Sequence, residues 1–240
     1  MTVEKLCVDR YLPGEQFDPA RLPPLDNLAR ATHKELALDW DTRWQTGQEL
    51  RIRFLDGDRA GRARVEAVAR TWLDHANLGF VFGDFLDSDI RITFTGSEYS
   101  SSVGKDATHV PPDEPTMILS GLDHEEDPIH LRSVVLHEFG HAIGCIHEQA
   151  SPAANIPWDE AKVYAYYLQH EGWNKPTTYH NVLLRYAAGD SIPHTPHDPD
   201  SIMQYPVPSF LTLDGSEIGW NTDLSAGDKA FIAKMYPRQA

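Results

Sequence analysis

The stretch "HEFGHAIGCIHEQ", which runs from His137 to Gln149, contains three histidines and two glutamates. If its first part is helical, His137 and His141 are four residues apart and project from one face of the helix, about one turn apart. This spacing allows two imidazole nitrogens to reach one metal ion at about 2 Å each. The alternative is an amphipathic helix that is merely rich in histidine, and the residues after His141 argue against it.

Gly144 explains how a third histidine can join the first two. A glycine at this position ends a helix by adopting a positive φ at little cost, so the chain can turn back and deliver His147 from outside the helix. Three neutral imidazoles leave a fourth position open, which is typical of a catalytic zinc site with one ion per chain. Glu138 is expected beside that position. Zinc lowers the pKa of a bound water from about 15.7 to about 7, so Glu138 can take a proton from this water and pass it to a leaving amine.

The helix that carries these residues is expected over 127–144. Asp127 suits the N-cap and Pro128 the first helical position, and Gly144 is a natural stop. The apolar stripe that should face the core consists of Leu131, Val135, Phe139 and Ala142. Because His137 and His141 lie off this stripe, core packing does not require them, and a metal-binding role is favoured.

A family resemblance rests on this motif and on "SIMQY" at 201–205. The first stretch resembles the zinc signature of the metzincin metallopeptidases, and Glu148, directly after the third histidine, is similar to the astacin branch. The resemblance implies that Met203 forms a methionine turn beneath the metal. It also implies that Tyr205 is the astacin-type tyrosine that ligates or approaches the zinc. Over residues 46–240 the chain resembles a minimal, microbial-style metzincin between the astacin and matrixin patterns.

The expected fold class is α+β, and the resemblance makes it a metzincin, or zincin-like, fold. Residues 1–45, rich in proline and charge, are expected to be an N-terminal extension of a catalytic domain at 46–240. The upper lobe, about 46–147, should hold a mixed twisted sheet and two long helices. The lower lobe, about 148–240, should be mostly loops and helices around the methionine turn.

The segment "PTMILSG" at 115–121 is predicted to be a short edge strand, because prolines lead into it. An edge strand can bind an extended peptide through main-chain hydrogen bonds. The residues expected to bind substrate in this way are Met117, Ile118, Leu119 and Ser120.

The predicted function is a zinc endopeptidase that cleaves extended protein or peptide substrates. The alternative is a zinc-binding interaction module without catalysis, and Glu138 argues against it because such a module has no use for a base beside the metal. The formal net charge of −15 disfavours nucleic acid and anionic membranes as partners. The sequence shows no signal peptide or transmembrane segment, and export is expected only by analogy with the family. Compartment, oligomeric state, calcium binding and cleavage-site preference stay open.

The chain has two cysteines, Cys7 and Cys145, and the sequence leaves open whether they form a disulfide. Cys7 is a soft ligand ahead of the catalytic domain, so its thiolate could occupy the open zinc position and hold the enzyme latent. The surrounding "LCVDRYLPG" does not match the matrixin cysteine-switch motif. The alternative is a packed or solvent-facing thiol.

Overall fold

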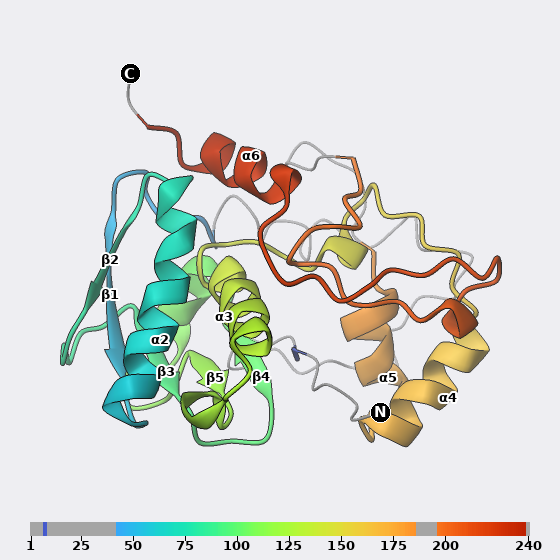
Figure 1. The fold of residues 1–240 in the computed structure, drawn as a ribbon, viewed down its shortest axis with the longest axis horizontal. Helices are drawn as coiled ribbons and strands as arrows, with labels where there is room; N and C mark the ends of the chain where they lie inside the picture. Colours follow the sequence, from blue (N-terminus) through green and yellow to red (C-terminus); the bar gives the residue numbers. More distant parts are fainter. Residues whose placement is uncertain (1–6, 9–41, 186–195, 239–240) are drawn as a thin grey trace.

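The computed structural model describes residues 7–8, 42–185 and 196–238. Most of the predicted extension over 1–45 therefore lies outside the described residues. Two helices lie in front of a twisted sheet on one side of the molecule, and shorter helices and loops form the other side (Figure 1). Among the described residues, no helix has the length and apolarity needed to cross a membrane.

The sheet has five strands in the order β2-β1-β3-β5-β4. Their bounds are Glu49–Phe54 for β1, Gly79–Phe82 for β2, Ile90–Thr93 for β3, Tyr99–Ser101 for β4 and Met117–Leu119 for β5. All neighbours are parallel except β4, which runs antiparallel to β5 with Ser100 opposite Ile118. This arrangement confirms the predicted mixed sheet.

The prediction that residues 115–121 form an edge strand is wrong. β5 is hydrogen-bonded to β3 on one side and to β4 on the other, so Met117, Ile118 and Leu119 present no free edge, and Ser120 lies just beyond the strand. The edge strand is β4, whose sequence "YSS" spans only three residues. The preceding prolines lie in the loop before β5, where a missing N–H costs no ladder hydrogen bond.

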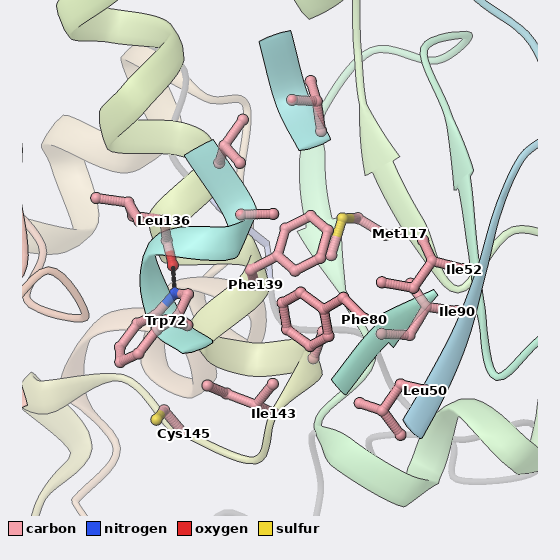
Figure 2. Close-up of a cluster of buried hydrophobic side chains, with 14 of the residues drawn as sticks. Leu50, Ile52, Trp72, Phe80, Ile90, Met117, Leu136, Phe139, Ile143 and Cys145 are labelled. Atoms are coloured by element: carbon pink, nitrogen blue, oxygen red, sulfur yellow. Dashed lines mark hydrogen bonds between the residues drawn. The ribbon is translucent and has the colours of Figure 1, made fainter. Parts of the chain in front are cut away.

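Two helices cover the sheet. Helix α2 spans Arg59–Ala69 and begins at the Asp58 cap, and α3 spans Pro128–Ala142 and begins at Asp127, whose side chain accepts from the Ile129 amide at 2.8 Å. The cap and Pro128 are as predicted, and the predicted stripe of Leu131, Val135, Phe139 and Ala142 is buried. A short helix, Arg70–Asp74, follows α2 and contacts α3. The indole of its Trp72 donates a hydrogen bond to the Leu136 carbonyl at 3.0 Å (Figure 2).

The upper core forms where α3 meets the sheet. The ring centroids of Phe80 and Phe139 are 5.5 Å apart, and both rings lie against a layer of strand side chains (Figure 2). That layer consists of Leu50, Ile52, Ile90 and Met117, each of them at most 1% exposed. Burial of each such side chain stabilises the folded state by about 1.5–3 kcal/mol, so this core holds α3 against the sheet.

The other side of the molecule contains α4 at Glu160–His170 and α5 at Lys175–Thr178, and long loops lead from them to α6 at Ala226–Met235, which lies above α2 and α3 (Figure 1). A second buried cluster lies here. It includes Cys7, Val163, Tyr167, Val182, Tyr205 and Leu211. Helix α6 returns to the upper core, where the Tyr236 hydroxyl donates to the Ile143 carbonyl at 2.7 Å. The end of the chain therefore braces the end of α3.

Candidate metal centre and active site

Helix α3 places His137 and His141 side by side, with ring centroids 4.9 Å apart. The helix ends as predicted, because Gly144 has a φ of 100° and its amide donates to the His141 carbonyl at 2.8 Å. The turn returns His147 to the helix face. The Nε2 atoms of His141 and His147 then lie 3.1 Å apart.

These residues fit a zinc ion. The Nδ1 atom of His137 lies 2.7 Å from the Ile202 carbonyl, and that of His141 lies 2.9 Å from the Cys145 carbonyl. A carbonyl can only accept, so each Nδ1 carries the hydrogen and each Nε2 is left to bind metal. Two nitrogens at 2.0–2.1 Å from one tetrahedral zinc are about 3.3 Å apart, close to the separation of the His141 and His147 atoms.

The thiol of Cys7 completes a group of four donor atoms with His137, His141 and His147. All four atoms lie within 4.8 Å of one another. The Cys7 sulfur is also 3.5 Å from Oε2 of Glu138. Cys7 and Cys145 both remain thiols, so the structure contains no Cys7–Cys145 disulfide. Cys145 packs in the upper core instead (Figure 2).

The chain around Cys7 lies along the edge strand. Cys7 pairs with Tyr99 as an isolated parallel bridge, and the Val8 amide donates to the Tyr99 carbonyl at 2.9 Å. The hydroxyl of Tyr205 donates to the carbonyl of Cys7. Cys7 is thus held through its side chain, its carbonyl and its strand pairing at once.

Glu138 is only 1% exposed and, with His137 and Cys7, lines a pocket. The pocket walls include Tyr99, Val134, Tyr205 and Trp220. Burial, together with the charges of Glu125 and Glu138, raises the pKa of Tyr99 to about 12. Tyr99 and Glu138 line the same pocket, so the negative charge of the carboxylate disfavours ionisation of the Tyr99 phenol.

The turn at 201–205 lies directly beneath the histidines. Met203 is 3% exposed, and a Cβ atom added at Gly140 would lie only 2.3 Å from the Met203 sulfur. The Glu148 amide donates to the Met203 carbonyl at 3.0 Å. The Tyr205 ring meets the His147 ring edge-on, with centroids 4.4 Å apart. The structure thus brings Met203, Tyr205 and Gly140 to the metal group.

Glu148 itself points away from the metal group, into a patch of carboxylates. Its Oε1 accepts from the Asp198 amide at 2.9 Å. Burial is the main reason that its pKa rises to about 7, and the charges of Asp228 and Asp198 add to the rise. The motifs in the sequence do not point to Asp198 or Asp228, nor to the pocket residues Tyr99 and Trp220, as parts of the site. Among these four, only Asp228 belongs to a local sequence pattern, as the fourth residue of a capping box that begins at Ser225.

The same architecture occurs in known proteins. The solved structure of myroilysin superimposes with a TM-score of 0.81 at 36% sequence identity, covering 85% of this chain and 99% of that one. The chain belongs to the astacin-like metzincin metallopeptidases. A second myroilysin structure matches at 33% identity with a TM-score of 0.68, covering 98% of this chain and 91% of that one.

A more distant neighbour shares the metzincin fold. High choriolytic enzyme 1, a hatching enzyme zinc-protease from Oryzias latipes (Medaka fish), matches with a TM-score of 0.57 at 15% identity, covering 83% of this chain and 96% of that one. No family model and no curated protein matches the chain. The metzincin assignment makes the chain a zinc metalloendopeptidase, and its group of three histidines and Cys7 could hold one zinc ion.

Proposed function

We propose that this metzincin hydrolyses peptide bonds in extended protein or peptide segments, with Glu138 as the general base. A zinc ion held by His137, His141 and His147 would supply Lewis acidity at this site. The observation that supports Glu138 most directly is its contact with Cys7. The sulfur belongs to the donor group and lies 3.5 Å from Oε2, so a small molecule in its place would be within reach of the carboxylate.

In this mechanism Glu138 removes the proton of the attacking water and then gives it to the leaving amine. Proton transfer by a positioned side chain contributes about 10²–10⁴-fold to the rate. The carboxylate is almost fully buried.

Tyr205 is proposed to stabilise the oxyanion. Its hydroxyl already donates to a backbone carbonyl, that of Cys7, immediately beside the metal group. That carbonyl is a chemical stand-in for the scissile carbonyl of a substrate. A donor in this position favours the transition state most, because the oxygen gains negative charge as water attacks.

The substrate is proposed to bind along β4, in place of the internal strand β5. β4 is the end of the sheet nearest the metal group, and its Tyr99 carbonyl already accepts a main-chain hydrogen bond from Val8. An extended peptide can add to such an edge and place alternate side chains in pockets. A chain with a net charge of −15 does not suit nucleic acid or an anionic membrane as an alternative partner.

We also propose that Cys7 keeps the enzyme latent. A thiolate is a good zinc ligand, and Cys7 offers its sulfur at the position that water needs. Its neighbour Val8 simultaneously covers the edge strand. Both the metal and the substrate strand are therefore blocked by one short segment.

The deciding experiment combines metal analysis with cleavage of a peptide library. The full chain carrying Cys7→Ser is compared with the same chain carrying Glu138→Ala as well. We expect one zinc in each and cleavage only where Glu138 is present. A zinc-loaded Cys7→Ser chain that cleaves nothing would favour the alternative, a zinc-binding interaction module without catalysis.

A further inference from the structure

The Ile202 carbonyl fixes the orientation of one zinc ligand. It lies 2.7 Å from Nδ1 of His137, which determines the tautomer and directs Nε2 toward the metal group. The carbonyl belongs to the turn at 201–203, so any displacement of this turn would rotate the His137 ring. The groups that hold the turn therefore control the geometry of the zinc site.

One carboxylate, that of Asp228 in the first turn of α6, holds the turn. Its Oδ2 accepts from the Ile202 amide at 2.8 Å, and its Oδ1 accepts from the Ser201 hydroxyl at 2.6 Å. The Ser201 hydroxyl in turn accepts from the Met203 amide at 3.1 Å. Asp228 is 8% exposed, so these bonds form away from bulk water. Three consecutive residues of the turn are thus tied, directly or through one hydroxyl, to a single side chain.

We propose that Asp228 is a positioning residue for the zinc site, acting on His137 through the Ile202 carbonyl. This goes beyond the proposed function, because it rests on the zinc site and not on which peptides are cleaved. The competing explanation is that Asp228 only caps α6. Its Oδ2 does accept from the Ser225 amide at 2.9 Å, completing a capping box with the Ser225 hydroxyl.

A cap alone does not account for the contacts. Capping requires one carboxylate oxygen to accept from the Ser225 amide, yet two of the three described hydrogen bonds of the Asp228 side chain run to the turn. A charged acceptor makes hydrogen bonds roughly twice as strong as a neutral one does. The carboxylate is thus shared between the helix end and the turn beneath the metal.

Three single substitutions separate the two explanations. Asp228→Asn keeps the size but removes the charge and one acceptor. Ser201→Ala keeps the charge of Asp228 and its bond to the Ile202 amide, and removes only the link that runs through the Ser201 hydroxyl. Ser225→Ala is the matched control, because it removes the other half of the capping box without touching Ser201 or Ile202.

The first measurement is the rate at which zinc-loaded full chains lose zinc to excess 4-(2-pyridylazo)resorcinol, followed by its absorbance. Disruption of groups that orient metal ligands typically costs about 10–100-fold in metal affinity, so we expect Asp228→Asn to release zinc at least about tenfold faster. Ser201→Ala should release zinc faster in the same direction by a smaller factor. Ser225→Ala should stay within about twofold of the wild type, although its melting temperature falls.

The second measurement is the visible spectrum of the cobalt-substituted chains, whose ligand-field bands report the coordination geometry. These bands should shift in Asp228→Asn and Ser201→Ala and not in Ser225→Ala. Because Ser201→Ala keeps the negative charge, its effect separates positioning from a loss of electrostatic attraction for the cation.

Equal zinc-release rates and identical cobalt spectra in Asp228→Asn and Ser225→Ala would overturn the proposal, leaving Asp228 a helix cap. If Asp228→Asn does not fold, a wild-type release rate in Ser201→Ala overturns it equally. A wild-type chain without stoichiometric zinc would refute the metal site itself, which is a different result from either.

Discussion

Replacing Tyr205 with phenylalanine tests whether its hydroxyl acts on the reacting carbonyl. The substitution keeps the ring, which is 2% exposed and packed against His147, and removes only the oxygen that donates to the Cys7 carbonyl. If that donor serves the oxyanion, its loss costs about 2.7–4 kcal/mol of transition-state stabilisation, or about 10²–10³ in kcat. KM should stay within a few-fold, because the lost interaction forms mainly in the transition state.

A purely structural hydroxyl predicts a different outcome. Its hydrogen bond would contribute about 0.5–1.5 kcal/mol to stability, which lowers the melting temperature of a chain of this size by about 1–6 °C and leaves kcat nearly normal. The assay measures kcat and KM on a quenched fluorescent peptide for Cys7→Ser with and without Tyr205→Phe, beside the zinc content of both. An unchanged kcat with full zinc would refute the oxyanion role. Loss of zinc together with activity would assign Tyr205 as a ligand instead.

The proposed zinc ligands, the proposed base, the Cys7 thiol and the half-buried carboxyl of Glu148 give four further predictions. His141→Ala should abolish stoichiometric zinc in metal analysis, because its Nε2 lies 3.1 Å from that of His147, and full retention would contradict the ligand assignment. Glu138→Ala should keep zinc but lose hydrolysis by about 10²–10⁴-fold, so activity within a few-fold of the parent would require another base. Cys7→Ser should activate the full chain and abolish its response to thiol reagents, and latency through Cys7 is ruled out if neither changes. Because the pKa of Glu148 rises from 4.5 to about 7 on folding, the native state retains a proton that the unfolded state releases. The free energy of unfolding should therefore fall as the pH rises across this window. Urea unfolding at pH 5 and pH 7.5 should show a smaller fall in Glu148→Gln, and equal falls would show that Glu148 is not the group responsible.

Local signals in the sequence predicted the active-site helix well. Asp127 and Pro128 define its start by chemistry that needs no tertiary contact, and Gly144 defines its end by its φ of 100°. The placement of the three proposed metal ligands follows from the same local rules, since two of them share a helix face and the third follows a glycine turn. The fold class was also predicted correctly, because the motif and the order of elements together favour a metzincin.

Strand order was not predictable in the same way. The edge position depends on which strands pair over long sequence distances, and three-residue "YSS" carries almost no periodicity. The prolines before β5 suggested an edge, although they occupy the loop that precedes it. The role of Asp228 was hidden for a related reason. Its capping pattern is local, but its bonds to Ser201 and Ile202 join residues 27 and 26 positions apart in the sequence.

Cys7 combines the three interactions that a substrate would need. Its sulfur lies in the metal group, its carbonyl accepts from Tyr205, and its backbone pairs with Tyr99 on the edge strand. In the proposed mechanism, a peptide that is to be cleaved presents a carbonyl to the zinc and to Tyr205 while lying along the same strand. Cys7 and a substrate peptide would therefore compete for all three contacts. A change that removes only one contact of Cys7 leaves the other two in place. We expect Cys7→Ser to free the metal position and give measurable, partial activity, although the Val8 amide still pairs with the Tyr99 carbonyl. Full activity should then require displacement of the whole segment around Cys7 from the edge strand. The difference in activity between the Cys7→Ser chain with this segment in place and the same chain with it displaced measures how much of the inhibition comes from the strand pairing.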